Sequence, residues 1–360
     1  MAGERKRILF LLPSLTGGGA ERVFTTLLRH LDRSRFEPHL ALLQAQGAYM
    51  GDIPKDVPTH DLKVSRVRYA LPKILWMIWK MRPQTILATM GHLNIALIAA
   101  KPFFPPDTKL VVREAVIPSA LFREENQNKQ LWGWLYRTFY KRADRVVCLS
   151  DSMVSDLAEN FRIPQEKLVR IYNPVDTEKV RERAEIGGNP FSGKGPHLVA
   201  AGRVCRQKGF DLLIEAMPAV LQRFPDAQLF ILGEGPLQAE LKEQAQNLGV
   251  QDKVLFLGFQ ANPWLYLKHA DAFILPSRYE GLPNVLLEAL ALGTPVVVSD
   301  CPGGIREIKE SVGNMAVVPP ENPGALAEAI ITVCGSPAPA IKSLGRFDVQ
   351  QVVSEYNNIF

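Results

Sequence analysis

The sequence predicts an α/β protein built from two doubly wound parallel sheets. Short, continuously apolar runs alternate with helical patterns along the chain, which is typical of strands buried on both faces. The alternation begins again after a stretch at 186–196 that is dense in Gly and Pro, and this stretch is the expected linker. The length of 360 residues suits two domains.

Five buried strands are expected in the first half, with helical segments between them. A helix is expected at 20–31, directly after three consecutive glycines. This order of elements favours a parallel sheet, because parallel strands need helical crossovers. The strands are expected at 8–12, 39–43, 85–89, 110–113 and 145–149.

The second half repeats the pattern, with a helix expected at 210–223 and strands at 197–201, 228–232, 254–257, 272–275 and 295–299. We therefore expect an N-terminal domain at 1–185, a C-terminal domain at 186–345, and a helix at 346–360 that packs back toward the N-terminal domain. Two such domains would face each other across a cleft, the default ligand site.

The net charge of +5 is divided unevenly along the chain. Residues 1–180 hold 27 basic and 18 acidic residues, a net +9, and residues 181–360 hold 15 and 19, a net −4. The two halves are therefore expected to meet different partners. Nucleic acid is not an expected partner, because no RNA- or DNA-binding motif is present.

Four cysteines lie far apart, without a Cys-x-x-Cys pair or a His at ligand spacing, and are expected to be reduced thiols in a cytosolic protein: Cys148, Cys205, Cys301 and Cys334. No signal peptide is expected, because the apolar run after Arg5 ends at Pro13. No apolar stretch is long enough to span a membrane. A soluble or peripheral protein is expected.

The first loop carries Gly17, Gly18 and Gly19 between a strand and a helix. Backbone amides of such a loop can approach an anion, although a simple tight turn remains an alternative. A dinucleotide site fits less well, because Arg22 stands where the third glycine of the G-x-G-x-x-G pattern would be.

Two cations follow the strand at 197–201, in the pattern Gly202-Arg203-x4-Lys208-Gly209. Cations at the mouth of a strand-to-helix loop suit a diphosphate, although a solvated surface pair is the alternative.

A pair of carboxylates follows the strand at 272–275. Glu280 is expected in the loop and Glu288 on the following helix, with Asn284 as its N-cap. Carboxylates accept hydroxyl protons, so the pair suits a polyol, with a phosphate near the helix start. Solvated charges are the alternative.

Four motifs in this order resemble retaining glycosyltransferases of family 4, which have the GT-B fold. They are Glu-x7-Glu with Gly-Leu-Pro after the first Glu, Gly-Arg-x4-Lys-Gly, the N-terminal Gly-Gly-Gly-Ala-Glu loop, and the run from Asn173 to Asp176. The resemblance extends from Leu9 to about Ile308. It implies two Rossmann-like domains, with acceptor binding in the first and nucleotide-sugar binding in the second.

The resemblance also implies roles for individual residues. Glu280 would hold the hydroxyls of the donor sugar, Glu288 would hold the ribose, and Arg203 and Lys208 would stabilise the departing diphosphate. The backbone from Gly281 to Leu286 would face the sugar and phosphates. The expected catalytic residues are His92, Arg203, Lys208 and Glu280, and the expected substrate-binding residues are Gly17, Gly18, Gly19, Arg113, Asn173, Gly202, Phe259, Gly281, Leu282, Pro283, Asn284, Val285, Leu286 and Glu288.

His92 enters this set because family members commonly have a His at this point; a structural hydrogen bond is the alternative. The order Arg113-Glu114 departs from the related Ser-Glu-Arg segments. The run from Asp300 to Glu307 resembles a segment of members that build cell-surface glycans, which indicates a bacterial source. No metal ion or other cofactor is expected, since no Asp-x-Asp is seen to bind a metal between phosphates.

Two aromatic and basic segments, at 73–82 and 132–142, could contact an anionic membrane or could be ordinary core-facing helices. The expected activity is transfer of a hexose or N-acetylhexosamine from a UDP-sugar to a polyprenyl-diphosphate-linked saccharide, at the cytoplasmic face of the inner membrane. The alternatives are a soluble sugar or sugar-phosphate acceptor, a GT-B-like nucleotide-sugar epimerase, and a non-catalytic binder.

Overall fold

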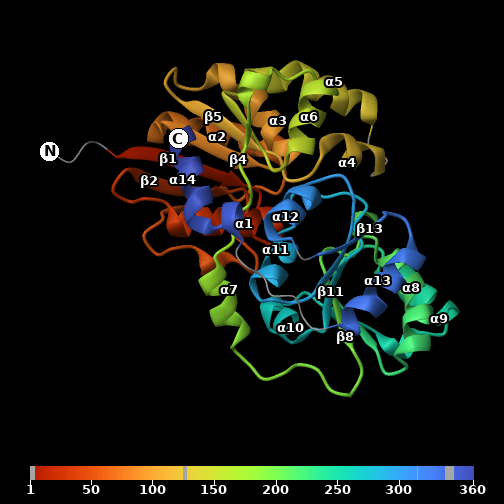
Figure 1. The fold of residues 1–360 in the computed structure, drawn as a ribbon. Coiled ribbons are helices and arrows are strands. Elements are labelled where there is room, and N and C mark those ends of the chain that lie inside the picture. The colour runs from red at the N-terminus through yellow and green to blue at the C-terminus, as the bar shows by residue number, and fades with distance from the viewer. Residues whose placement is uncertain (1–4, 125–127, 314, 337–343) are drawn as a thin grey trace. The chain divides into compact units, whose positions relative to one another are not determined.

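The computed structural model describes residues 5–124, 128–313, 315–336 and 344–360. The chain forms two compact units, one made of residues 1–174 and 347–360 and the other of residues 175–346. Each unit contains one parallel sheet with helices on both faces (Figure 1), so the expected α/β fold with two doubly wound sheets is confirmed.

The sheet of the first unit has the strand order β3-β2-β1-β4-β5-β6-β7, and every neighbouring pair is parallel. The central strands are almost completely buried because both faces are covered by helices. The strands are β1 (Lys6–Leu12), β2 (Phe36–Leu42), β3 (Thr59–Asp61), β4 (Thr85–Thr89), β5 (Lys109–Arg113), β6 (Arg145–Cys148) and β7 (Leu168–Arg170).

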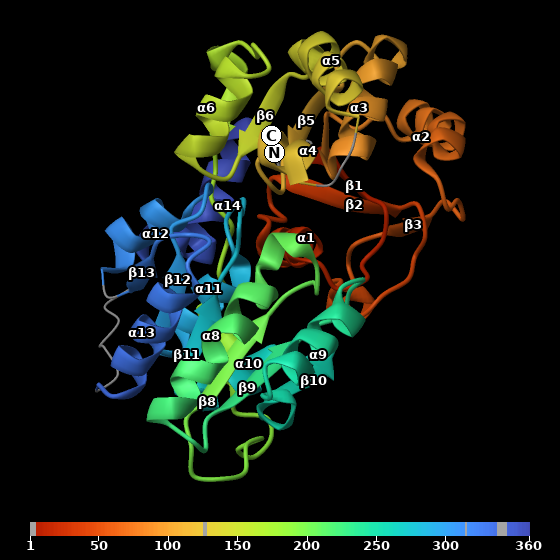
Figure 2. The ribbon, with the colours of Figure 1, turned by 90° about the vertical axis from the view of Figure 1, so that its right-hand side faces the viewer.

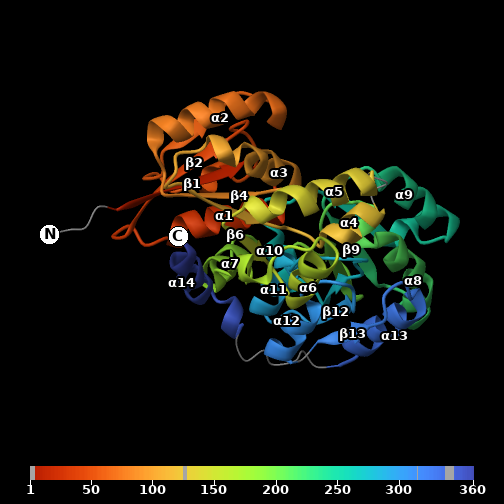
Figure 3. The ribbon, with the colours of Figure 1, turned by 90° about the horizontal axis from the view of Figure 1, so that it is seen from above.

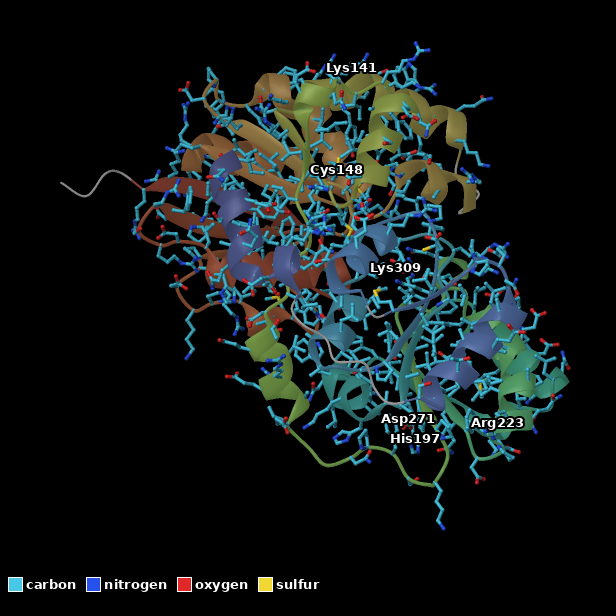
Figure 4. All side chains as sticks on the ribbon, viewed as in Figure 1. Lys141, Cys148, His197, Arg223, Asp271 and Lys309 are labelled. Atoms are coloured by element: carbon cyan, nitrogen blue, oxygen red, sulfur yellow. The ribbon has the colours of Figure 1, made fainter. Side chains whose placement is uncertain are left out.

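Helices α1 and α14 pack together on one face of this sheet, and helix α2 lies on the other face (Figure 3). Helix α3 packs against both α2 and α5. Cys148 ends β6 in the interior of the unit (Figure 4). The helices are α1 (Gly19–His30), α2 (Val67–Met81), α3 (Gly91–Ala100), α4 (Pro118–Glu124), α5 (Lys129–Phe139), α6 (Asp151–Glu159) and α14 (Val349–Ile359).

Helix α14 completes the first unit, although it comes from the end of the sequence. The ring of Phe360 makes edge contacts with Phe10 and Phe36, at centroid distances of 6.1 and 5.9 Å. The backbone oxygen of Phe360 accepts hydrogen bonds from Lys6 Nζ and Thr85 Oγ1. The last residues therefore fill the core that α1 and the first strands begin.

The sheet of the second unit has the strand order β10-β9-β8-β11-β12-β13, again with parallel neighbours. At its amino edge, the backbone N–H of His197 donates to Asp271 Oδ2 at 2.7 Å, and Figure 4 shows the two residues side by side. The strands are β8 (His197–Ala201), β9 (Gln228–Leu232), β10 (Val254–Gly258), β11 (Ala272–Leu275), β12 (Val296–Ser299) and β13 (Ala316–Val318).

One large apolar core lies between this sheet and helices α8 and α13, which pack against each other. Helix α7 packs on α10 and α11. The helices are α7 (Thr177–Ala184), α8 (Phe210–Arg223), α9 (Gln238–Asn247), α10 (Pro263–His269), α11 (Asn284–Ala291), α12 (Ile305–Val312) and α13 (Pro323–Cys334).

The division into units differs from the expected domain boundary between 185 and 186. The chain passes from the first unit to the second at Pro174 and Val175, because α7 packs on helices of the second unit. The Gly- and Pro-rich stretch at 186–196 accordingly lies within the second unit. The chain returns to the first unit at Phe347.

In each sheet the chain order reverses direction once. The reversal lies between β1 and β4 in the first sheet and between β8 and β11 in the second. Loops that leave the carboxyl ends of strands at such a point diverge and leave room for a ligand. Among the described residues, no helix is both long and apolar enough to cross a membrane.

Candidate functional site

The reversal point of the second sheet brings Lys208 and Glu280 together. Lys208 Nζ lies 2.6 Å from Glu280 Oε1, and Ser277 Oγ donates to the same oxygen at 2.6 Å. Lys208 follows β8 and Glu280 follows β11, and the Glu280 side chain is buried. The sheet order therefore places a cation and a carboxylate in contact at the carboxyl edge, where the sequence predicted both for substrate binding.

Two glycines permit this contact. Gly202 has φ +149°, and a Cβ there would lie 2.9 Å from Lys208 Cε. Gly303 has φ +141°, and a Cβ there would lie 2.8 Å from the backbone oxygen of Glu280. L-residues rarely adopt these φ values, so both positions need glycine for conformational and for steric reasons.

Arg278 connects the two loops that carry Lys208 and Glu280. Its backbone N–H donates to Gln207 O at 2.8 Å, and Gln207 Nε2 donates to Tyr279 O at 3.0 Å. The Arg278 guanidinium makes two 2.7 Å hydrogen bonds to Asp211, at the start of α8, and donates to Arg206 O at 2.9 Å. The loop after β8 and the loop after β11 are thus fixed to each other by one arginine.

The electrostatics of this arginine follow from its partners. The hydrogen bonds that Arg278 donates to Asp211 raise the pKa of Arg278, with a further contribution from Glu321, whose Oε1 lies 2.7 Å from Arg278 Nε. Burial alone would raise the pKa of Asp211, but pairing with Arg278 outweighs it and lowers that pKa. The sequence interpretation missed Arg278, because a lone arginine in a loop has no pattern that separates it from a solvated surface charge.

The other predicted residues of the second unit are distributed along the same edge. Arg203 is exposed, and Glu288 is buried on α11. Phe259 is exposed beyond the end of β10, which is separated from β8 by β9. The structure therefore pairs Lys208 with Glu280 directly and places Phe259 two strands away.

The loop after β11 is held by the loop after β12. Glu280 N–H donates to Pro302 O at 2.9 Å, and Gly304 N–H donates to Gly281 O at 2.8 Å. The expected N-cap at Asn284 is wrong, because Asn284 is the first helical residue of α11 and Pro283 is the N-cap. The amide of Leu286, expected to face the ligand, donates to Pro283 O within the helix. Leu282 is buried and Val285 is half-buried.

In the first unit, backbone amides of the glycine loop after β1 are hydrogen-bonded to a side chain of the following helix. The N–H groups of Gly17 and Gly18 donate to Glu21 Oε2 at 2.7 and 3.1 Å. Burial raises the pKa of Glu21, against the lowering effect of these hydrogen bonds. Gly19 begins α1, and Glu21 is at its third position. The acidic residue three positions after the N-cap Gly18 was the signal for this arrangement.

His92 lies in the first turn of α3, directly after a strained residue that joins β4 to this helix. Met90, the N-cap of α3, has φ +79°, a conformation unfavourable for a residue with a side chain. His92 remains accessible to solvent, although the surrounding protein partly desolvates its ring and lowers its pKa. The imidazole is therefore biased toward its neutral form at pH 7.

Arg113 and Asn173 contact each other. Arg113 Nη2 donates to Asn173 Oδ1, and both side chains are buried. The neighbouring Glu114 accepts hydrogen bonds from Asn94 Nδ2 and from the hydroxyls of Tyr136 and Tyr140. Burial raises the pKa of Glu114 and lowers that of Arg113. The strand end that was expected to bind substrate is therefore a buried polar network inside the first unit.

Comparison with known proteins matches both halves of the chain to family models. Residues 17–179 match the model described as Glycosyltransferase Family 4, and residues 182–344 match the one described as Glycosyl transferases group 1. A curated relative from Campylobacter jejuni is N-acetylgalactosamine-N,N'-diacetylbacillosaminyl-diphospho-undecaprenol 4-alpha-N-acetylgalactosaminyltransferase. It is 32% identical over 305 residues, which cover 82% of this chain and 81% of the relative.

Solved structures share the fold over nearly the whole chain. Sucrose-phosphate synthase from Thermosynechococcus elongatus superposes with a TM-score of 0.79 at 18% identity, covering 99% of this chain and 98% of the other. Anabaena HepE in complex with UDP-glucose superposes with a TM-score of 0.75 at 21% identity, covering 98% of this chain and 100% of the other.

Proposed function

Because the chain belongs to glycosyltransferase family 4, with the GT-B fold, we propose that it moves a hexose or N-acetylhexosamine from a UDP-sugar to a lipid-linked saccharide, with retention at the anomeric carbon. That the protein is a glycosyltransferase follows from its family. The observation that carries the finer proposal is the contact of Lys208 with Glu280 at the reversal point of the second sheet.

The proposed donor site uses this contact for the sugar diphosphate. Lys208 and the exposed Arg203 would take the negative charge of the leaving diphosphate, and Glu280 would accept hydrogen bonds from hydroxyls of the sugar. Glu288 would bind the ribose. In this proposal the side chains supply the charge for the leaving group, and no metal ion is required.

The proposed reaction occurs on one face of the sugar. The bond between the anomeric carbon and the phosphate oxygen breaks, and a bond from the acceptor oxygen to that carbon forms on the same side. The acceptor hydroxyl passes its proton to the leaving phosphate oxygen. Fixed cations lower the barrier by stabilising the charge that develops on this oxygen.

The acceptor is proposed to be a polyprenyl-diphosphate-linked saccharide of glycan or polysaccharide biosynthesis. The name of the Campylobacter relative describes transfer to a saccharide on diphospho-undecaprenol, which supports this choice. The first unit would bind the acceptor, with His92 near the reacting sugar. The protein would act as a peripheral enzyme on the cytoplasmic face of the inner membrane.

A nucleotide-release screen tests the proposal. The purified protein is incubated with UDP-, GDP- and ADP-sugars alone, with a membrane lipid extract, or with soluble sugar phosphates, and free nucleotide and product are measured. The expected result is UDP release that depends on the lipid extract. Release that depends only on a soluble sugar phosphate would overturn the lipid-linked acceptor. Conversion of the donor sugar without any acceptor would instead show an epimerase.

A further inference from the structure

The outer face of helix α2 exposes three aromatic side chains. Tyr69, Trp76 and Trp79 are 60%, 65% and 46% exposed, and the neighbouring Phe103, in the short helix Lys101–Phe103, is 66% exposed. Trp79 Nε1 donates to Phe103 O at 2.8 Å, which joins this residue to the helix. We call these four residues the aromatic stripe.

The stripe is not needed to hold α2 in the fold. The opposite face of the helix is buried by Ala70, Ile74, Met77 and Ile78. At about 100° per residue, positions 69 and 76 fall on one line along the helix, and position 79 lies beside it. An α2 that served only to cover the sheet would carry polar residues here, so these rings are apolar surface in excess of what folding requires.

Cations surround the stripe. Arg68 lies over the ring of Tyr69, Lys80 over Trp76 and Arg82 over Trp79, at 4.8, 4.9 and 4.2 Å from the ring centres. The sequence from 62 to 106 contains seven Lys and Arg residues and no Asp or Glu. Among these cations, Lys101 is paired with Asp144 at 2.6 Å. The surface therefore combines large aromatic rings with an excess of positive charge.

We propose that the aromatic stripe is the surface by which the first unit lies on an anionic lipid bilayer. Trp and Tyr rings favour the headgroup level of a membrane, and nearby Lys and Arg side chains are attracted to anionic lipids. The inference deepens the membrane attachment under the proposed function and rests on it. Binding to vesicles, however, requires neither donor nor acceptor, so the two can be tested separately.

The topology gives this surface a functional position. Helix α2 follows β3 and leads into β4, so it begins at the carboxyl edge of the first sheet. Helix α3, whose first turn carries His92, follows β4 at the same edge. Figure 2 shows α2 at the outer side of the first unit, next to the end of the sheet formed by β1, β2 and β3. A bilayer that contacts α2 would thus lie along the unit that is proposed to receive the lipid-linked acceptor.

Helix α5 is the other candidate for membrane contact, and it exposes fewer tryptophans than α2. The Trp132 ring of α5 stacks on Phe122 at a centroid distance of 5.7 Å, and the residue is half-buried. Trp134 is exposed and makes an edge contact with Phe139 at 6.0 Å. Helix α5 therefore exposes one tryptophan and provides a matched control for α2.

Co-sedimentation with lipid vesicles tests the inference. The full chain is mixed with vesicles of equal parts phosphatidylglycerol and phosphatidylcholine, or of phosphatidylcholine alone, at low and high salt. We expect salt-sensitive binding to the anionic vesicles only. The double variant Trp76→Ala/Trp79→Ala should weaken this binding by about tenfold or more. Arg68→Glu/Lys80→Glu should weaken it by on the order of twentyfold or more, since each cation contributes about fivefold.

Trp134→Ala on α5 and Arg223→Glu on α8 are the controls, and each should bind the vesicles like the natural protein. Equal binding by the Trp76→Ala/Trp79→Ala variant, or equal binding to neutral vesicles, would overturn the inference. A third result would also overturn the inference: the natural protein self-associates with rising concentration, and the Trp76→Ala/Trp79→Ala variant loses this self-association but still binds vesicles. A second copy of the chain would then be the partner that covers the stripe. Vesicle binding without lipid-dependent nucleotide release would contradict the proposed function, but it would still support the aromatic stripe as the membrane-binding surface.

Discussion

Lys208 Nζ and Glu280 Oε1 are 2.6 Å apart, although 72 positions separate the two residues in the sequence. The contact exists because β8 and β11 are neighbours at the point where the sheet order reverses. Each group compensates the charge of the other in a largely buried environment. Removal of either one leaves the other without its ion-pair partner.

Lys208→Ala and Glu280→Gln should each reduce turnover by on the order of 10²–10³, because each removes a charged group from the proposed diphosphate and sugar site. Nucleotide release measures the loss, and circular dichroism checks that the variants fold. Lys268→Ala is the control, since it removes an ion pair with Glu185 elsewhere in the same unit. Near-normal turnover in Lys208→Ala or Glu280→Gln would contradict the site.

Arg278→Lys should reduce kcat by about tenfold or more while the donor KM changes little, because the two loops lose their bidentate connection but keep Lys208 and Glu280. The double variant Arg278→Lys/Lys208→Ala should be no worse than Lys208→Ala alone, since Arg278 acts through that contact. Arg223→Lys, on the exposed surface of α8, is the control. An unchanged kcat, or strictly additive losses, would show that Arg278 does not position the site.

Gly202→Ala should reduce both stability and turnover. The φ of +149° costs about 1–3 kcal/mol for a residue with a side chain, and the new Cβ would displace Lys208. Gly249→Ala is the matched control, because Gly249 also has a positive φ, +68°, but has open space around it. Thermal unfolding and nucleotide release distinguish the two. A Gly202→Ala enzyme as active as the Gly249→Ala enzyme would contradict the predicted displacement.

Glu114→Gln should change how stability depends on pH. Burial raises the pKa of Glu114, so the native state keeps a proton that the unfolded chain releases near pH 4.5. The stabilisation from this group is complete below pH 4.5 and is lost as pH rises toward its folded pKa, at up to about 1.4 kcal/mol per pH unit. Glutamine does not titrate, so the natural protein should lose stability relative to Glu114→Gln as the pH rises above about 4.5.

Thermal unfolding at several pH values measures this difference. The exposed Glu166→Gln should follow the natural protein at every pH. Parallel curves for Glu114→Gln and the natural protein would show that Glu114 is ionised in the folded state.

Most of the strands could be predicted from short runs of apolar residues that are buried in the sheets. Four of them, at 85–89, 197–201, 228–232 and 272–275, have the observed bounds. The edge strands β3, β7 and β13 were missed because each has only three residues and β3 and β7 carry no fully buried position. Short edge strands form because they pair with a neighbouring strand of the sheet, and their local sequence shows little strand pattern.

In the candidate site, too, features with a local sequence signal could be predicted, and features that depend on the fold could not. Lys208 and Glu280 could be identified because their motifs are local, but their contact depends on the sheet order. Glu21 accepts hydrogen bonds from the Gly17 and Gly18 amides, and its place three positions after Gly18 is the sequence signal for this, which the glycine pattern alone does not contain. Arg278 shares no short motif with its partner Asp211, so only the fold brings them together.

The contribution of α14 to the first unit constrains the order in which the protein can fold during synthesis. The second unit is one continuous segment, and all of it is translated before residues 347–360, which complete the first unit. Until those residues emerge, the surface of Phe10 and Phe36 that receives Phe360 has no cover. The first unit is therefore the first to be translated but the last to complete its core. While residues 347–360 are missing, the apolar surface that they cover is open to aggregation.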